Sequence, residues 1–218
     1  MVFQPHRFSG GDSVSRDRDP FERALEAIRI KLRSGEGLQG RALAINLLAR
    51  ELGVSQTPVR EALAWLAGEG LVVRGHAGYV GRTFDGASLA ELYRLNLAHV
   101  LAALSADLRA ATPGLAGQGT RPPWPLTDSA DPNATFDVLV AQAADRTLLA
   151  SLRRTREPLS PFVAAEAPLI GDQEATMEAL RLTYPDPAGL RRAARAFYRR
   201  RVHAASMLFS ATLERLQI

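Results

Sequence analysis

Four polar residues at the amino end of one short segment can hydrogen-bond to bases and phosphates. They are Ser55, Gln56, Thr57 and Arg60. Val59, Leu63 and Leu66 recur in the same segment at helical spacing, so one face of a helix must be buried and the polar residues project from the other side. Arginine pairs with guanine and glutamine with adenine, while serine and threonine side chains reach phosphate through their hydroxyl groups or contact the thymine methyl group through apolar atoms. The pattern indicates a helix that reads the DNA major groove.

Two short helices joined by a tight turn would position these residues. The spacing predicts one helix from about Arg41 to Leu52, with Leu47, Leu48 and Leu52 on a shared apolar stripe. Gly53 supplies the left-handed conformation that ends it. The second helix runs from Ser55, its N-cap, to Ala67. An ordinary αα-hairpin is the common alternative to a helix-turn-helix.

A predicted β-hairpin after these helices favours the helix-turn-helix. Residues 70–74 and 79–82 are β-type runs around the turn Gly75-His76-Ala77-Gly78. A hairpin in this place is a wing, and His76 and Gly78 at its tip would approach the DNA backbone or minor groove. We therefore predict a winged helix-turn-helix.

The same stretch resembles a known family. Residues 48–63 and 69–72 are similar to the DNA-binding domain of GntR-type bacterial transcription regulators, over about the first third of the chain. The resemblance implies that Asn46 and Arg50 lie near the DNA side of the first helix of the pair. Gln56 stands where the family most often has arginine, so we expect a half-site that depends less on guanine at that step.

The composition is that of an ordinary globular protein. The 218 residues are 46% hydrophobic and carry a net charge of +4, with no cysteine, which excludes thiol chemistry and disulfides. Lys31 is the sole lysine, so the basic side chains are almost all guanidinium groups. Residues 1–20 lack a secretory pattern and no apolar run is long enough to cross a bilayer, so we expect a cytoplasmic protein with no membrane partner.

The fold class expected is mainly α, with three parts. Residues 1–18 form a flexible arm, 19–84 the winged helix-turn-helix domain, and 85–218 an all-helical bundle for effector binding and dimerisation. Asp19-Pro20 begins the first helix. Ser88 and Glu91 are interpreted as a capping box for a helix that runs to about Ala111. Residues 112–130 are too rich in glycine and proline for regular structure. The further helices are expected at 132–143, 147–157, 160–168, 172–184 and 187–218.

The second domain is similar, more loosely, to the effector-binding (FCD-like) domain of the FadR-like branch. The resemblance implies a pocket for small organic acids, often with a metal held by one aspartate and several histidines. Here Asn96 replaces the expected arginine, and Asp137 stands at an expected histidine. His99 and His203 are too few for a three-histidine site, so we expect no metal and no cofactor.

Several side chains remain candidates for effector contact: Asn96, His99, Asp137 and Arg201. His99 lies on an apolar helix, where a hydrogen-bonded core residue is the commoner reading. Arg195 and Arg199 mark the exposed side of the last helix, whereas Arg201 lies nearer its apolar stripe. The arginines at 153, 154 and 156 either clamp a carboxylate or form a solvated face near a helix end.

We therefore expect a sequence-specific, DNA-binding homodimer that acts on a near-palindromic operator as a repressor, with a small organic acid as candidate effector. The alternative is a winged-helix protein whose helical domain is a metal-free ligand-binding or protein-interaction module, with little sequence-specific DNA binding. An enzyme is disfavoured because the sequence has no phosphate-binding glycine loop, no His-Glu-x-x-His and no Gly-x-Ser-x-Gly.

Overall fold

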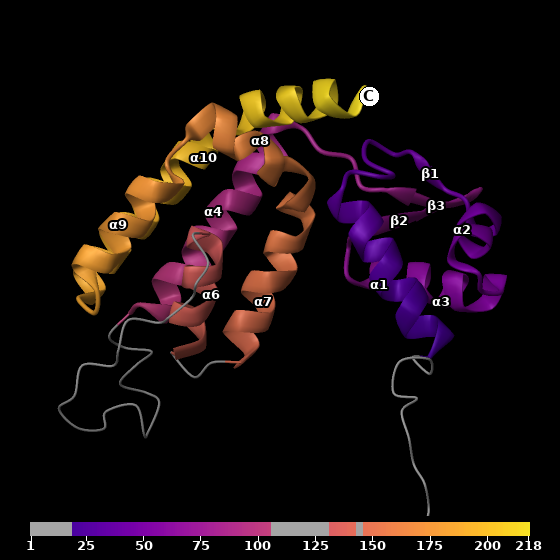
Figure 1. Cartoon of the computed structure of the whole chain (residues 1–218), viewed down its shortest axis with the longest axis horizontal. Helices are drawn as coiled ribbons and strands as arrows, with labels where there is room; N and C mark the ends of the chain where they lie inside the picture. The colour runs from indigo at the N-terminus through magenta and orange to yellow at the C-terminus, as the bar shows by residue number, and fades with distance from the viewer. Residues whose placement is uncertain (1–18, 106–130, 143–145) are drawn as a thin grey trace, which may run out of the picture.

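A computed structural model describes residues 19–105, 131–142 and 146–218. It contains a winged domain with a small sheet and a helical domain, which lie side by side (Figure 1). Each has a separate cluster of buried apolar side chains. The expected arm at 1–18 and the irregular segment at 112–130 lie outside the described residues.

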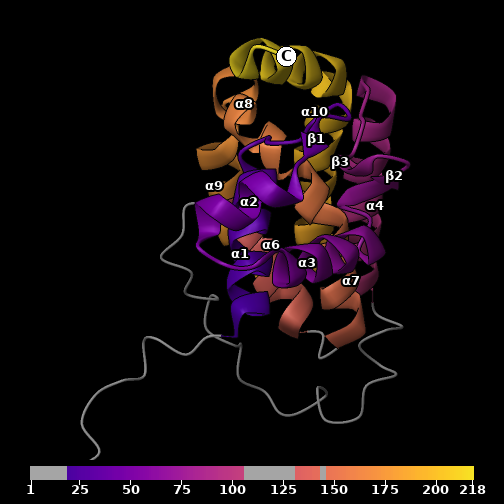
Figure 2. The ribbon, with the colours of Figure 1, turned by 90° about the vertical axis from the view of Figure 1, so that its right-hand side faces the viewer.

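The winged domain begins with three helices: α1 (Pro20–Arg33), α2 (Ile45–Leu52) and α3 (Gln56–Gly68). Asp19 caps α1 as predicted, because its Oδ1 accepts the Phe21 N–H at 3.0 Å. Gly53 ends α2 in the left-handed conformation (φ 63°), also as predicted. Figure 2 looks onto this domain and shows α3 crossing in front, below α2.

The wing is a three-stranded antiparallel sheet in the order β1-β3-β2, made of β1 (Ala42–Leu43), β2 (Val72–Gly75) and β3 (Gly78–Gly81). The predicted hairpin is β2 and β3. The prediction that a helix begins at about Arg41 is wrong, because Leu43 pairs with Tyr79 as strand β1 and α2 begins only at Ile45. Leu47, expected on the apolar stripe, is half exposed. Leu48 and Ala49 are the residues that α2 buries.

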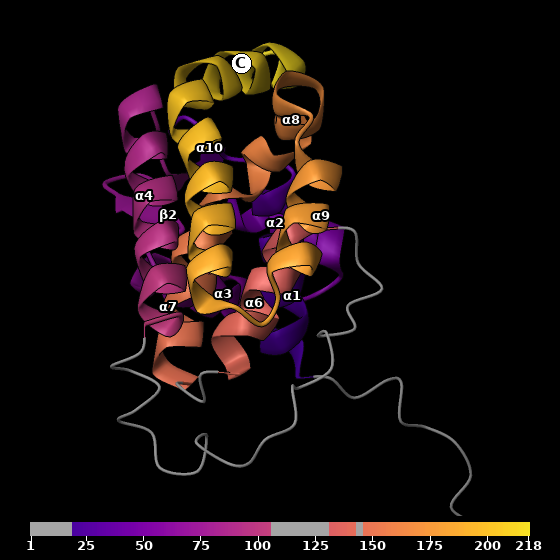
Figure 3. The ribbon, with the colours of Figure 1, turned by 90° about the vertical axis from the view of Figure 1, so that its left-hand side faces the viewer.

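The helical domain opens with α4 (Gly86–Ala103) and continues with α6 (Pro132–Gln142), α7 (Arg146–Arg156) and the short 3₁₀ helix η1 (Glu157–Leu159). It is completed by α8 (Ser160–Ile170), α9 (Gln173–Thr183) and the long α10 (Pro187–Leu216). Figure 3 shows α4, α10 and α9 on the face away from the winged domain. None of the helices in the described ranges is long and apolar enough to span a membrane.

Three predicted details of the helical domain are wrong. The capping box of α4 is made by Asp85 and Ser88, not by Ser88 and Glu91, because the helix begins at Gly86. The same helix ends at Ala103 rather than near Ala111. Just after this end, the Leu104 carbonyl accepts a hydrogen bond from Arg191. Helix α8 continues through Pro168 to Ile170, and it ends at Gly171 in the left-handed conformation.

The connector between α1 and β1 joins the two domains. Leu38 packs into the core of the helical domain, together with Phe84. The side-chain amide of Gln39 pairs with the backbone N–H and C=O of Phe84, both at 2.8 Å. Gly35 lies against Leu216, at the end of α10 that reaches over the winged domain (Figure 1). These contacts fix the winged domain against the bundle.

The first prediction concerns the close approach between the wing and this connector. A methyl group at Gly81 would overlap the Gly37 carbonyl group. The change Gly81→Ala should therefore lower the free energy of unfolding by about 1–3 kcal/mol through overpacking, as measured by urea denaturation.

The matched control is Gly68→Ala at the end of α3, where an added methyl group meets nothing within 4 Å. This variant should be as stable as the wild type or slightly more stable. Equal stability of the two variants would contradict the close approach at Gly81.

Candidate functional site

The position of α3 determines which of its side chains face outward. One face is buried through five residues: Pro58, Val59, Ala62, Leu63 and Leu66. This face shares a core with Ala24 and Ile28 of α1. The four polar residues singled out in the sequence are all exposed on the other side of α3. The predicted division of the helix into a buried and an outward face is confirmed.

A hollow of about 390 Å³ lies beside the amino end of α3 and brings together residues from three elements. Gln56 and Arg60 line it from α3, Asn46 from α2, and Gly78 from the wing. The wall is completed by Ala77, Tyr79 and residues 42–45. Four of the eight residues predicted to contact DNA therefore share one surface.

The other four predicted residues lie nearby but do not line the hollow: Arg50, Ser55, Thr57 and His76. All four are exposed. Ser55 occupies the N-cap position of α3, but its hydroxyl accepts no backbone hydrogen bond there, which differs from the predicted capping role. The first N–H groups of α3 thus face outward without a side-chain cap, an arrangement that suits a phosphate oxygen.

The charge of this surface comes from arginines that lack a carboxylate partner in the described chain. Arg50 and Arg60 are joined by two that the sequence analysis did not single out, Arg41 and Arg74. Arg41 precedes β1 and Arg74 lies in β2, so they flank the two edges of the sheet. In the sequence Arg74 lay at the end of the first predicted hairpin strand, whereas Arg41 was placed in a predicted helix and gave no such signal. Exposed guanidinium groups without a carboxylate partner among the described residues favour contact with a phosphate backbone.

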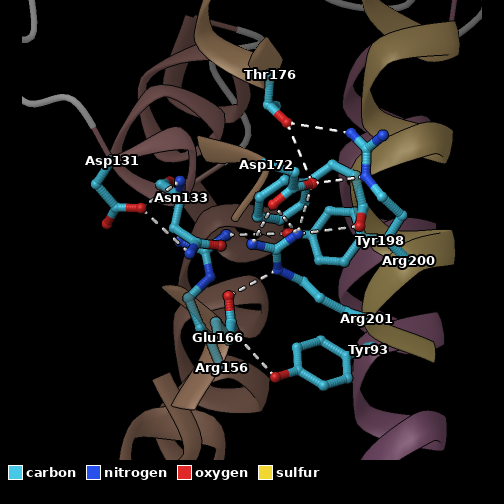
Figure 4. A network of polar contacts seen from close by, with 11 residues as sticks. Tyr93, Asp131, Asn133, Arg156, Glu166, Asp172, Thr176, Tyr198, Arg200 and Arg201 are labelled. Carbon is cyan, nitrogen blue, oxygen red and sulfur yellow. Dashed lines mark hydrogen bonds and ion pairs between the residues drawn. The ribbon is translucent and has the colours of Figure 1, made fainter. Parts of the chain in front are cut away.

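Arg201, predicted as an effector or interface contact, lies fully inside the helical domain. Its Nε donates to Glu166 at 2.8 Å and its Nη1 donates to both oxygens of Asp172 at 3.2 Å. The guanidinium also sits 3.3 Å from the centre of the Phe197 ring. Figure 4 shows Glu166, Asp172 and Arg201 converging from α8, the start of α9 and α10. An effector could reach Arg201 only by displacing one of its two carboxylates.

The surroundings of this cluster shift the pKa values of its acids in opposite directions. Burial raises the pKa of Glu166 above its usual value, and Arg201 offsets that shift only in part. Burial acts in the same direction on Asp172, but Arg201 and Arg200 outweigh it and leave its pKa lowered. Tyr93 donates to Glu166 at 2.7 Å, and burial raises the pKa of its hydroxyl well above the usual value. The cluster therefore holds its charges through mutual pairing.

Two other candidate effector residues already have internal partners. Asn96 is buried and its Nδ2 donates to Leu92 and Thr155 carbonyls, while its Oδ1 has no partner among the described residues. The Nδ1 of His99 lies 2.8 Å from the Leu95 carbonyl and therefore donates to it, which leaves Nε2 to accept from Ser151 at 2.8 Å. Both ring nitrogens of His99 are therefore occupied, as expected for a hydrogen-bonded residue, but the ring is half-buried and does not lie in the core.

Asp137 faces cations. Its carboxylate accepts from Arg153 at 3.1 Å and forms a second ion pair with Arg156. Two of the three arginines at 153–156 thus clamp a carboxylate of the chain itself, whereas Arg154 faces solvent. The residues do not fit the metal site that the family resemblance implies, because cations surround the aspartate. Within residues 19–105, 131–142 and 146–218, no three acidic, histidine or cysteine side chains are grouped to hold a metal ion.

A helix-turn-helix followed by an antiparallel wing defines the class: a winged helix-turn-helix protein. Residues 20–78 match the family described as bacterial regulatory proteins, gntR family, so the winged domain is a GntR-family domain. This family is one of regulators and not of enzymes, and the resemblance seen in the sequence is confirmed for this domain. No curated protein matches the chain.

Solved structures extend the likeness to the helical domain. A structure of E. coli McbR/YncC superposes with a TM-score of 0.62 at 16% identity and covers 88% of this chain and 100% of that one. A structure of Lar, which controls the expression of the Listeria monocytogenes agr system and mediates virulence, superposes with a TM-score of 0.53 at 16% identity. The match covers 89% of this chain and 100% of that one. At these identities the likeness establishes the fold, including a winged domain followed by a helical domain.

The second prediction concerns the buried ion cluster. The change Arg201→Met would leave Glu166 and Asp172 buried without their shared cation. It should lower the free energy of unfolding by about 3–5 kcal/mol in urea denaturation.

The control is Arg199→Met, on the exposed side of the same helix, which should leave stability within about 0.5 kcal/mol of the wild type. Adding Glu166→Gln and Asp172→Asn to Arg201→Met should restore part of the loss, because no buried charge is then left unpaired and Arg200, which also pairs with Asp172, is exposed. If Arg201→Met were as stable as Arg199→Met, the structural role of the cluster would be refuted.

Proposed function

We propose that the chain is a sequence-specific transcription regulator that binds double-stranded DNA through α3, the start of α2 and the wing tip. The observation that carries the proposal is the shared surface of Asn46, Gln56, Arg60 and Gly78, flanked by unpaired arginines. An amide and a guanidinium on one outward helix face are the groups that distinguish adenine and guanine. The GntR-family match of the winged domain supports the same role.

In this proposal Arg60 contacts one base of the half-site, and Gln56 contacts a base at another position of the same half-site. Ser55 and Thr57 bind phosphate or a thymine methyl group, and Arg50 lies close to the backbone. His76 and Gly78 bring the wing tip to the backbone or the minor groove.

We further propose that the protein acts as a homodimer on a near-palindromic operator and represses its target. One recognition helix makes few base contacts, so two copies related by a two-fold axis supply the affinity and length of an operator. The helical domain offers apolar side chains for pairing, since Leu95 on α4 is 45% exposed and Met207 on α10 is 56% exposed. Repression follows if the bound dimer excludes other proteins from the operator.

We propose that any small organic acid effector binds without a metal. Asp137, Glu166 and Asp172 already pair with arginines. His99 contacts the Ser151 hydroxyl. The Nδ1 of His203 donates to the Arg199 carbonyl at 2.7 Å. A carboxylate ligand would instead need free arginines, which recognise it by paired hydrogen bonds.

The third prediction tests the reading of DNA by Arg60. A duplex selected from a random pool and a scrambled duplex are compared by fluorescence anisotropy at fixed salt. Arg60→Ala should lose about 1–3 kcal/mol of discrimination between them. Arg181→Ala, at an exposed site of α9, should behave as the wild type.

Wild-type protein that binds both duplexes equally and only at low salt would point to a protein-docking module instead. Discrimination unchanged by Arg60→Ala would remove Arg60 from the reading surface.

The fourth prediction concerns base preference at Gln56. The change Gln56→Arg should move the preferred base at one position of each half-site from adenine towards guanine, because arginine pairs with the O6 and N7 atoms of guanine. Repeating the selection from a random pool with the variant measures this change. A preference that changes at no position, or at a position that Arg60→Ala also alters, would contradict the assignment of Gln56.

A further inference from the structure

A second hollow, of about 450 Å³, lies between the two domains, away from the DNA-reading surface. The carboxyl ends of α1 and α3 form one wall, and α7 with η1 forms the other. Five arginines line it: Arg29, Arg33, Arg153, Arg154 and Arg156. We call it the interdomain cleft. Its volume is in the range of sites for small molecules.

The carboxylates of the cleft neutralise only part of this charge. They are Glu69, Asp137 and Glu157. Glu69 accepts both of its short hydrogen bonds from Arg29, at 2.6 and 2.7 Å. Glu157 pairs with Arg33 at 2.7 Å, across the domain boundary, and Arg33 also lies 3.7 Å from the exposed Glu26, which does not line the cleft. Each of these two acids thus neutralises one arginine.

The third carboxylate is shared. Asp137 pairs with both Arg153 and Arg156, so one negative charge faces two positive ones. Arg154 has no carboxylate partner in the described chain, and its side chain is exposed. Five arginines and three carboxylates leave the cleft with a net charge of +2.

Hydrogen-bonding capacity is left over as well. The Nε–H groups of Arg29 and Arg156 are buried and have no acceptor among the described residues. Buried donors are almost always paired in folded proteins, so two orphaned donors in the walls of one cleft mark an incomplete site.

We propose that the interdomain cleft binds a small dianion, a phosphate or a dicarboxylate, through Arg154 and the Arg153–Arg156 pair. Two negative charges match the excess of two positive ones. Guanidinium groups bind both carboxylate and phosphate oxygens with paired, charge-assisted hydrogen bonds. Leu71 and Ala150 give the cleft a short apolar lining, which favours a compact anion with few carbon atoms.

A dianion held by the α7 arginines would face the winged domain, because Arg29, whose Nε–H has no acceptor among the described residues, lines the opposite wall of the cleft. Resting on the proposed function, this makes the cleft a regulatory site whose occupant changes the affinity for DNA. By linkage, DNA changes the affinity for the anion by the same factor.

The fifth prediction is that the full chain binds a small dianion in the interdomain cleft. Titration calorimetry with inorganic phosphate and, separately, with succinate, at constant ionic strength, tests it. At least one should bind, and whichever binds identifies the source of the dianion. Arg154→Gln should weaken that binding by at least roughly tenfold, the loss expected for one hydrogen bond to a charged group. Arg154 is exposed, so the variant should unfold at the wild-type temperature.

Arg146→Gln is the matched control, since it makes the same charge change in the same helix outside the cleft. It should leave the affinity for the anion unchanged. Binding of neither anion by the wild type, or equal weakening by both variants, would overturn the proposal.

A separate DNA titration keeps the two proposals apart. Anion binding without DNA binding would leave the cleft assigned and refute the regulator. Selective DNA binding without anion binding would support the regulator and refute the anion site in the cleft.

Discussion

Burial of one face of α3 against α1 is the constraint on which the rest of the winged domain depends. With Val59, Leu63 and Leu66 fully inside, rotation of the helix is fixed, and Gln56 and Arg60 cannot turn away from solvent. Gly53 sets the angle between α2 and α3, which brings Asn46 to the same surface. The sheet then places the wing tip beside them. The geometry of the reading surface is therefore a consequence of core packing, not of contacts among the surface residues themselves.

Arginine has two different uses in this chain. Arg201 is buried and fully paired, and it holds α8, α9 and α10 together as a rigid scaffold. Arg60 and Arg154, in contrast, are exposed and have no carboxylate partner in the part of the chain that the structure describes. A buried guanidinium needs partners to offset its desolvation, whereas an exposed one keeps its hydrogen-bonding capacity for another molecule. Arg60 lies at the surface proposed to read DNA and Arg154 at the interdomain cleft.

The sequence was sufficient to predict features that depend on neighbouring residues. Helical spacing located the buried face of α3, and it also placed Arg201 nearer the apolar stripe than Arg199. Strand β1 was missed because two residues carry no periodic signal and gain their structure only by pairing with β3. The carboxylates around Arg201 were missed because they lie 29 and 35 residues away, on other elements. The interdomain cleft likewise depends on how the two domains pack, which no local pattern encodes.

The most direct test of the account is hydrogen–deuterium exchange of the full chain with and without a selected duplex. Amide exchange should slow at residues 45–60 and 75–78, where the reading surface lies, and change little along α9. Slower exchange confined to the helical domain, with residues 55–60 unaffected by the duplex, would show that the outward face of α3 does not meet DNA and would contradict the central claim.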